Sequence, residues 1–245
     1  MSKIIVITGA GAGLGRALAR RFAADGDSVV LLGRTAEKVE KVARELGKGA
    51  LALGCDVSSP ESVREAFAAI ARRHPRFDVL INNAAFYQPF PVAEATDEQI
   101  VRTLSTNLMG PIFCSRAAIP MMGRGGHIIN VSSEVVEVPY PLFTLYQSSK
   151  AGLERFSDGL GRELAPSGIR VSTVRAGQMM DAEKTWELDP AVAARFHQAS
   201  LAAGINLREQ AITQYVSVTG VFRALIDLPA DLHIPSVMLR ARAAD

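Results

Sequence analysis

Short apolar runs alternate with longer helix-like segments along most of this chain, and the alternation limits the possible fold more than any other feature. Five of the runs are rich in β-branched residues and are typical of strands buried on both faces: Ile4–Ile7, Val29–Leu32, Val79–Ile81, Ile128–Val131 and Val171–Val174. Strands that alternate with helices form a parallel sheet whose faces are covered by right-handed crossovers. The pattern therefore predicts the α/β class, with a parallel sheet covered by helices on both faces.

Local signals indicate where the intervening helices begin and end. We expect helices over Leu14–Ala24, Ala36–Leu46 and Glu61–Arg73, and the last of these follows a capping serine and a proline at the first helical position. Residues Thr96–Gln99 have the pattern of a capping box, which opens a further helix. From Gln178 to about Gln214 the strand periodicity is absent, and alanine-rich helical stretches are expected there.

Length, charge and cysteine usage exclude several classes of protein. A chain of 245 residues without a linker or repeat suits one domain over 1–245. Its 27 basic and 25 acidic residues include no run of five like charges, which argues against a nucleic-acid partner. No stretch reaches about 18 uninterrupted apolar residues, so no membrane span is expected. Cys55 and Cys114 form no C-x-x-C motif, which favours a reduced, cytoplasmic chain.

A glycine-rich turn, Thr8–Gly15, follows the first predicted strand directly and opens the first predicted helix. A nucleotide pyrophosphate needs backbone amides within hydrogen-bond reach, and glycines leave room for it because they carry no Cβ. The helix N-terminus also favours negative charge. Glycines alone would fit any tight turn, but the strand-turn-helix context favours nucleotide binding.

Tyr146 and Lys150 stand four residues apart in a segment with helical character that extends to Leu164, so both point to one face. A phenol with a pKa of about 10 is a poor base at neutral pH, and a nearby ammonium is expected to lower that pKa. Such a tyrosine can donate a proton to a carbonyl oxygen that receives hydride, or remove it in the reverse direction. Ser133, just past the fifth strand, could hold the same oxygen. Taken singly, Tyr146 and Lys150 could be an ordinary pair on a helix surface, and Ser133 could simply end a strand. Their joint occurrence after a nucleotide turn favours catalysis.

Other kinds of chemistry have less support. The four histidines are scattered along the sequence, so we expect no metal site. A Ser-His-Asp hydrolase would need a G-x-S-x-G elbow, which the chain lacks.

Several motifs occur in one order along the chain as far as about residue 177. They are Thr8-Gly9-x-x-x-Gly13-x-Gly15, Cys55-Asp56-Val57, Asn82-Asn83-Ala84-Ala85, Asn107-Leu108-Met109-Gly110, Ser133 and Tyr146-x-x-x-Lys150. Their order and spacing, including the 13 residues from Ser133 to Tyr146, resemble the motifs of the short-chain dehydrogenase/reductase family. The resemblance implies a Rossmann-type doubly wound parallel sheet in a three-layer α/β/α domain, with strand order 3-2-1-4-5-6-7.

The resemblance also implies which residues form the site. Asn107, Ser133, Tyr146 and Lys150 would be catalytic. In such a site Lys150 would also bond the nicotinamide ribose, and Asn107 would anchor a water that relays protons to the lysine. Cofactor contacts are implied at the glycine turn and at the ends of the later strands: Thr8, Gly9, Gly11, Ala12, Gly13, Leu14, Gly15, Arg34, Asp56, Val57, Asn83, Ala84, Ala85, Tyr146, Lys150 and Gly177.

The residues after the second strand predict a preference for NADP(H) over NAD(H). In NAD-binding proteins of this fold an acidic residue there bonds the adenosine ribose. Here the position is Gly33, and Arg34 follows with a guanidinium that suits a 2′-phosphate. Ala12 stands where many NADP-specific relatives carry a second basic residue, which weakens the prediction.

Three features depart from the family pattern. Ala176-Gly177 replaces the usual Pro-Gly, Asp181 stands where a threonine is usual, and Ala85 replaces a glycine. The C-terminal segment also lacks the usual Thr-Gly and Asp-Gly-Gly elements. We expect a homodimer or a homotetramer, with the tetramer in more doubt.

The combined prediction is an NADP-dependent oxidoreductase that reduces a ketone or other carbonyl, or oxidises the secondary alcohol. Apolar side chains expected near the site favour an apolar substrate: Phe86, Tyr87, Phe90, Tyr140, Phe143, Met179 and Met180. We expect residues 178–214 to form a mobile substrate lid. The alternative is a catalytically silent dinucleotide-binding regulatory protein, because a fold alone does not establish catalysis. A nucleotide-sugar epimerase is disfavoured, since the segment after Gly177 is too short for a substrate domain.

Overall fold

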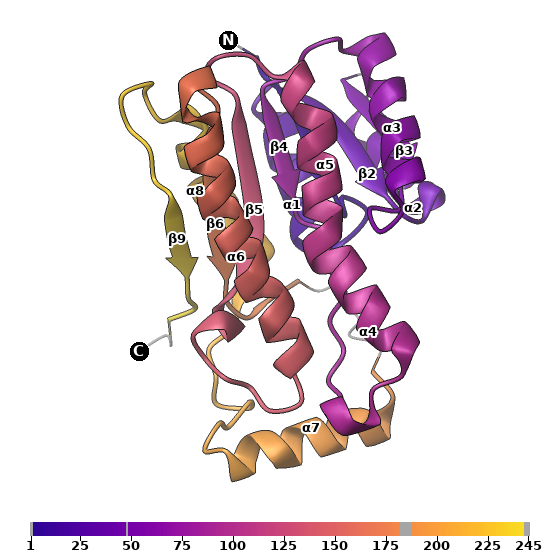
Figure 1. Ribbon diagram of the computed structural model, residues 1–245, viewed down its shortest axis with the longest axis vertical. Helices are drawn as coiled ribbons and strands as arrows, with labels where there is room; N and C mark the ends of the chain where they lie inside the picture. Colours follow the sequence, from indigo (N-terminus) through magenta and orange to yellow (C-terminus); the bar gives the residue numbers. More distant parts are fainter. Residues whose placement is uncertain (1, 48, 182–187, 243–245) are drawn as a thin grey trace.

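The computed structural model describes residues 2–47, 49–181 and 188–242, and a seven-stranded parallel sheet lies at its centre (Figure 1). The strand order is β3-β2-β1-β4-β5-β6-β9, which confirms the predicted order; the seventh strand carries the label β9 because two very short strands precede it. The strands are β1 (Ile4–Thr8), β2 (Ser28–Gly33), β3 (Ala50–Gly54), β4 (Val79–Asn82), β5 (His127–Ser133), β6 (Arg170–Ala176) and β9 (Ser236–Leu239).

The apolar runs form strands because each is covered on both faces of the sheet. Every residue of β4 and β5 is buried, as is the stretch of β2 from Val29 to Leu32. A strand buried on both faces has no polar face, so its sequence is continuously apolar rather than alternating. The five predicted strands therefore lie within β1, β2, β4, β5 and β6.

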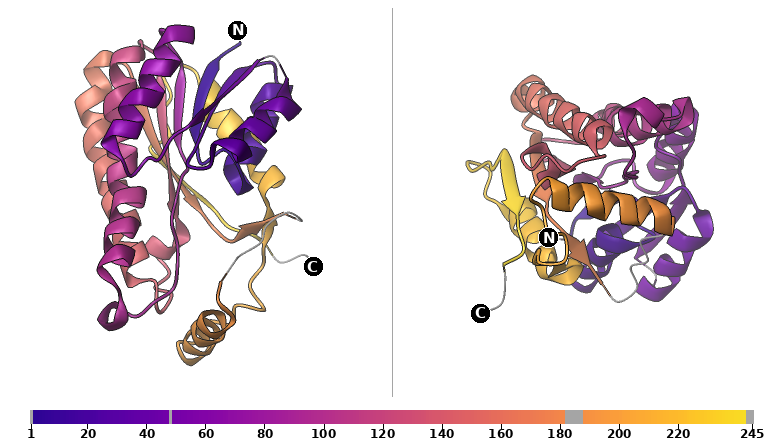
Figure 2. Two further views of the ribbon diagram at one scale, coloured as in Figure 1. Left: turned by 90° about the vertical axis from the view of Figure 1, so that its right-hand side faces the viewer. Right: turned by 90° about the horizontal axis from the view of Figure 1, so that it is seen from below.

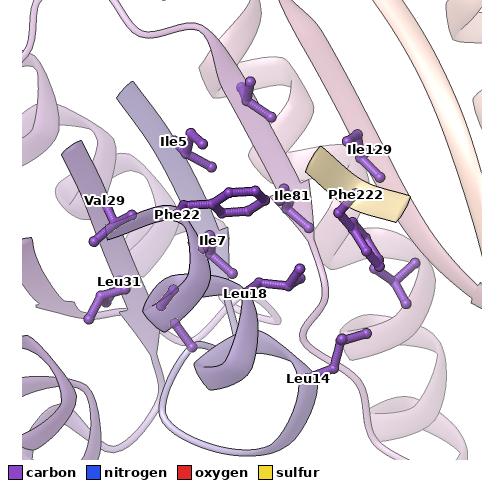
Figure 3. Close-up of a cluster of buried hydrophobic side chains, with 14 of the residues drawn as sticks. Ile5, Ile7, Leu14, Leu18, Phe22, Val29, Leu31, Ile81, Ile129 and Phe222 are labelled. Atoms are coloured by element: carbon purple, nitrogen blue, oxygen red, sulfur yellow. The ribbon is translucent and has the colours of Figure 1, made fainter. Parts of the chain in front are cut away.

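Two helical layers cover the sheet, as Figure 2 shows. One layer consists of α1 (Gly13–Ala24), α2 (Ala36–Leu46) and α8 (Tyr215–Asp227), and the other of α3 (Pro60–Arg73), α5 (Gly110–Ala118) and α6 (Thr144–Leu164). In the first layer Leu18 and Phe22 of α1 pack on Ile5 and Ile7 of β1, with Phe222 of α8 nearby (Figure 3). This burial anchors the glycine turn between β1 and α1.

The helix signals act as predicted. The Ser59 hydroxyl accepts a hydrogen bond from the amide of Ser62 at 3.2 Å, which caps α3. Thr96 and Gln99 form both bonds of the capping box that opens α4 (Asp97–Leu104). Short helical turns complete the chain: η1 (Val92–Glu94), η2 (Ser105–Met109), η3 (Ile119–Met121), η4 (Glu134–Val136) and η5 (Ala165–Ser167).

The segment predicted to be irregular holds one helix and two short strands in its described part, 178–181 and 188–214. Helix α7 (Pro190–Ala202) lies beyond the carboxyl edge of the sheet, at the bottom of Figure 1. Strands β7 (Met179–Met180) and β8 (Thr213–Gln214) pair with each other in parallel. The expectation that this segment contains no strand was wrong, because two-residue strands are too short to leave a periodic pattern. In the described ranges, no helix is both long enough and apolar enough to cross a bilayer.

Candidate active site

A cavity of about 910 Å³ runs along the carboxyl edge of the sheet, where the loops after β1, β2, β3, β4, β5 and β6 meet. The structure brings nearly all the predicted site residues to its walls. The exceptions are Thr8, Gly15 and Asn107, which do not line the cavity. Open α/β sheets bind ligands at this edge.

The glycine turn at one end of the cavity depends on two close backbone approaches. Gly9 has a φ of +67°, and a Cβ there would lie 2.9 Å from Cα of Ala84. A Cβ on Gly15 would lie 2.4 Å from the carbonyl oxygen of Gly9. No larger residue fits either position without moving backbone. Beside these tight contacts, Gly9, Gly11, Ala12, Gly13 and Leu14 line the cavity and form a cradle at the N-terminus of α1, which suits an anion.

Thr8 fixes this cradle to the neighbouring strand. Its hydroxyl accepts hydrogen bonds from the amides of Asn83 and Ala84, each at 3.0 Å. The Asn83 side chain donates in return to the Thr8 carbonyl at 3.0 Å. Thr8 thus joins the ends of β1 and β4 from behind the cavity wall, and the predicted cofactor contact of its own side chain stays a prediction.

Ser133, Tyr146 and Lys150 meet at the other end of the cavity. Ser133 ends β5, and its hydroxyl is hydrogen-bonded to the phenol of Tyr146. Lys150 lies one turn after Tyr146 on α6, and its Nζ is 5.8 Å from the centre of the tyrosine ring. Lys150 Nζ also donates to the carbonyl of Val131 at 2.8 Å, which fixes the ammonium against β5.

Burial dominates the protonation of both ionisable groups. It raises the pKa of Tyr146 to about 12, although the hydrogen bond with Ser133 acts in the opposite direction. It lowers the pKa of Lys150 to about 8, against the charge of Glu154. The expectation that the neighbouring ammonium brings the pKa of Tyr146 below its usual value was therefore wrong for the protein alone. Spacing reveals the neighbouring charge but does not reveal how completely the fold removes the phenol from water.

Asn107 lies in the π-helical turn η2, between α4 and α5, and is fully buried. Its side-chain amide donates to the carbonyl of Phe86 at 2.7 Å and to the Ser149 hydroxyl at 3.1 Å, and its oxygen accepts from the Phe86 amide at 2.7 Å. Asn107 therefore ties the segment after β4 to helix α6. Its predicted water relay to Lys150 stays a prediction.

The end of the cavity next to the glycine turn is basic. Arg34, Asp56 and Val57 line it, and their predicted cofactor contacts stay predictions. Lys38 of α2 lines it too, and its Cβ would lie 3.0 Å from a Cβ on Gly11. Sequence reasoning missed Lys38, although its position one helical turn after Arg34 was a usable signal.

Aromatic side chains form the wall beside Tyr146. The ring of Tyr87 lies 6.2 Å and that of Phe143 5.5 Å from the Tyr146 ring, and Phe196 of α7 packs 5.0 Å from Phe143. The other predicted apolar residues also line the cavity, except Phe90. Side chains that sequence reasoning missed come from distant segments: Phe196, Leu207, Ile212 and Tyr215.

The structure accounts for two of the departures from the family pattern, at Asp181 and at the turn of Ala176 and Gly177. The carboxylate of Asp181 lies 3.1 Å from the guanidinium of Arg16, in the second turn of α1, so its charge is balanced locally. The amide of Gly177 donates to the Leu239 carbonyl at 2.9 Å, which closes the turn after β6 against β9 without a proline. The short C-terminal strand thus supports the cavity wall at Gly177.

Comparisons with known proteins agree with this geometry. The sequence profile of the short chain dehydrogenases matches residues 3–192. Carbonyl reductase family member 4 of Danio rerio is 35% identical over 179 residues, which cover 72% of this chain and 76% of the relative. An NADP-dependent 3-hydroxy acid dehydrogenase of Salmonella typhi is 34% identical over 177 residues, 71% of either chain.

Solved structures are similar over almost the whole length. A short chain dehydrogenase from Burkholderia cenocepacia, solved in complex with NADP, superposes with a TM-score of 0.81 at 28% identity, and the match covers 98% of this chain and 96% of that one. The order of the motifs, the sheet topology and these matches lead to one conclusion. The chain belongs to the short-chain dehydrogenase/reductase family.

Proposed function

We propose that the protein is an NADP-dependent oxidoreductase that reduces a ketone or another carbonyl group, or oxidises the corresponding secondary alcohol. The observation that carries the proposal is the meeting of Ser133, Tyr146 and Lys150 at one end of a cavity that has a glycine cradle and basic side chains at its other end. A dinucleotide extends between two such ends, with its pyrophosphate at the cradle.

The residues of the cavity fit such a cofactor. The cradle lined by Gly9, Gly11, Ala12, Gly13 and Leu14 would take the pyrophosphate, and Arg34 with Lys38 would hold the 2′-phosphate. Bound NADPH supplies the hydride for reduction. The relatives named above include an NADP-dependent dehydrogenase and a structure with NADP, which supports the same cofactor here.

In the proposed reduction, the Ser133 hydroxyl orients the substrate oxygen and Tyr146 donates a proton to it as the carbonyl carbon accepts hydride. The carbonyl thereby becomes an alcohol, and the tyrosine is left as phenolate. A phenol whose pKa is about 12 stays protonated at neutral pH, which suits a proton donor. The Lys150 ammonium stabilises the phenolate that forms, and solvent then returns the proton.

The substrate is proposed to be apolar, because Tyr87, Phe143 and Phe196 form the wall beside Tyr146. Residues 178–214 are proposed as its lid. Of these, 182–187 lie outside the described residues, whereas Phe196 of α7 lines the cavity. The single domain over 1–245, the cytoplasmic location and the homodimer or homotetramer remain predictions.

The second candidate is a silent dinucleotide-binding regulatory protein. Such a protein needs the cradle and Arg34 but gains nothing from a serine hydroxyl bonded to a tyrosine phenol. Incubation of the purified protein with NADPH and a panel of ketones and acyl thioesters separates the two. We expect oxidation of NADPH by at least one apolar ketone. Tight NADPH binding with no turnover across the panel would favour the regulatory protein.

A further inference from the structure

Glu154 connects the helix that carries Tyr146 and Lys150 to two strands of the sheet. It lies on α6 one turn beyond Lys150 and two turns beyond Tyr146, so the three side chains share a face. Its Oε1 accepts hydrogen bonds from the Ser132 hydroxyl of β5 at 2.7 Å and from Arg175 Nε of β6 at 2.9 Å. Its Oε2 accepts from Arg175 Nη2 at 2.7 Å, which completes a bidentate pair.

Both strands end at the catalytic cavity. Ser132 directly precedes Ser133, and Arg175 directly precedes the cavity-lining pair of Ala176 and Gly177. Helix α6 lies over β5 and β6 in Figure 1. A single carboxylate therefore joins the helix that carries Tyr146 and Lys150 to the two strand ends that carry Ser133 and the cavity-lining Gly177.

Glu154 also supplies charge to a buried ammonium. Lys150 is 2% exposed, so its ammonium has lost most of its hydration. Burial lowers the pKa of Lys150, and the Glu154 charge acts against that effect. Without an opposing anion, a buried lysine tends to become neutral.

Arg175 does not cancel this negative charge. It pairs with two carboxylates, those of Glu154 and Glu137, and the charge of Asp158 further raises its pKa. Glu137 also pairs with Arg240, on the exposed side of the cluster. The cluster as a whole thus keeps an excess of negative charge near α6.

The other groups around Lys150 are named by element. On α6 the ionisable neighbours are Tyr146 and Glu154. Strand β5 presents the uncharged Val131 carbonyl, and the turn η2 contains no ionisable residue. The same cavity is also lined by Glu134 of η4 and Arg102 of α4, and by Arg34, Lys38 and Asp56 at its glycine-turn end; every variant of this test leaves these five charged groups in place.

We propose that Glu154 is a positioning residue that keeps Lys150 in its ammonium form and holds the catalytic helix in register with β5 and β6. The proposal rests on the proposed function for the purpose of that ammonium. The effect of Glu154 on the protonation of Lys150 is a property of the protein alone, so it can be tested without substrate or cofactor.

The test measures the pKa of Lys150 by NMR titration of protein labelled at the lysine side chains. The chain has six lysines, and Lys150→Arg assigns the signal. We expect Glu154→Gln to lower the pKa of Lys150 by about half a unit to one unit, because the ammonium loses an opposing charge. Glu154→Asp retains the charge and should keep most of the wild-type value. Arg175→Gln should raise the pKa, because it removes a like charge.

Glu137→Gln is the matched control, since it removes a carboxylate from the same arginine on the exposed side. It should leave the pKa of Lys150 unchanged. A Lys150 pKa that is the same in wild type, Glu154→Gln and Arg175→Gln would overturn the proposal. If Glu154→Gln does not fold, the other two variants provide the test. A higher Lys150 pKa in Arg175→Gln together with a wild-type pKa in Glu154→Asp would support the proposal, and an unchanged pKa in Arg175→Gln would count against it.

The same variants give a second readout in NADPH affinity measured across pH. If Lys150 contacts the nicotinamide ribose, as the family resemblance implies, the loss of affinity at alkaline pH should begin at lower pH in Glu154→Gln than in wild type, and at an unchanged pH in Glu137→Gln. A wild-type protein that does not bind NADPH would contradict the proposed function, whereas the lysine titration would still support or overturn the role of Glu154.

Discussion

Loss of the guanidinium at Arg34 should weaken NADPH binding far more than NADH binding. Arg34 lines the basic end of the cavity, and NADH lacks the 2′-phosphate that the guanidinium would hold. Hydrogen bonds to charged groups contribute about 1.5–3 kcal/mol, and the exposure of Arg34 places the value at the lower end. We therefore expect Arg34→Ala to raise the Kd for NADPH about tenfold and to change the Kd for NADH less than about twofold.

Lys38 should make a smaller contribution to the same discrimination. It is exposed, and an exposed ionic contact is worth about 0.3–1 kcal/mol, so Lys38→Gln should raise the Kd for NADPH about two- to fivefold. Lys41→Gln is the control, because Lys41 is exposed on the same helix but does not line the cavity. Fluorescence titration with both cofactors at low and high salt gives all the values, and the discrimination should shrink as salt rises.

The structure also corrects a substitution that the sequence alone would recommend. Gly33→Asp imitates the acidic residue of NAD-binding proteins, but a Cβ at this position would lie 2.7 Å from Cγ1 of Val39. The added side chain would overpack the contact with α2, so a changed preference would be mixed with a change in stability. Gly33→Ala measures the steric part alone. Equal binding of NADPH and NADH by the wild-type protein, or an equal loss of both in Arg34→Ala, would refute the assignment.

Three further predictions concern the frame around the site. Gly177→Ala should lower the free energy of unfolding by about 1–3 kcal/mol, since a Cβ there would lie 2.6 Å from the last carbonyl of β9. Gly159→Ala, at an open position in α6, should raise the free energy of unfolding by about 0.5–1 kcal/mol, and chemical denaturation measures both changes. Hydrogen exchange in α7 should slow when NADPH and substrate bind, and equal strong protection with and without them would contradict a lid. Lys150→Ala should weaken both turnover and NADPH binding, and an unchanged affinity would argue against its ribose contact.

The sequence was sufficient to locate five of the central strands because their signal is local, whereas their order in the sheet followed from the family resemblance. Each run such as Ile4–Ile7 is buried on both faces, so its own residues report the environment. Strands β7 and β8 were missed because two residues carry no periodicity and their pairing depends on segments more than thirty residues apart. Phe196 and Tyr215 were missed for the same reason, since only the folded chain brings α7 and α8 to the cavity.

Site residues within a motif were predictable, whereas their electrostatics were not. The spacing of Tyr146 and Lys150 on one helix correctly placed the two side chains together. The pKa of Tyr146 depends on burial by residues from several elements, and no local pattern reports that burial. The ion pair of Asp181 with Arg16 likewise depends on the tertiary fold, because the two residues are 165 positions apart in the sequence.

The central claim is that Tyr146 transfers the proton that accompanies hydride transfer. The most direct measurement compares turnover and NADPH affinity in wild type and Tyr146→Phe, which removes the transferable proton and little else. General acid catalysis contributes about 10²–10⁴-fold, so kcat should fall by at least a hundredfold while the Kd for NADPH changes less than about twofold. A Tyr146→Phe variant that keeps more than a tenth of wild-type turnover would contradict the assignment.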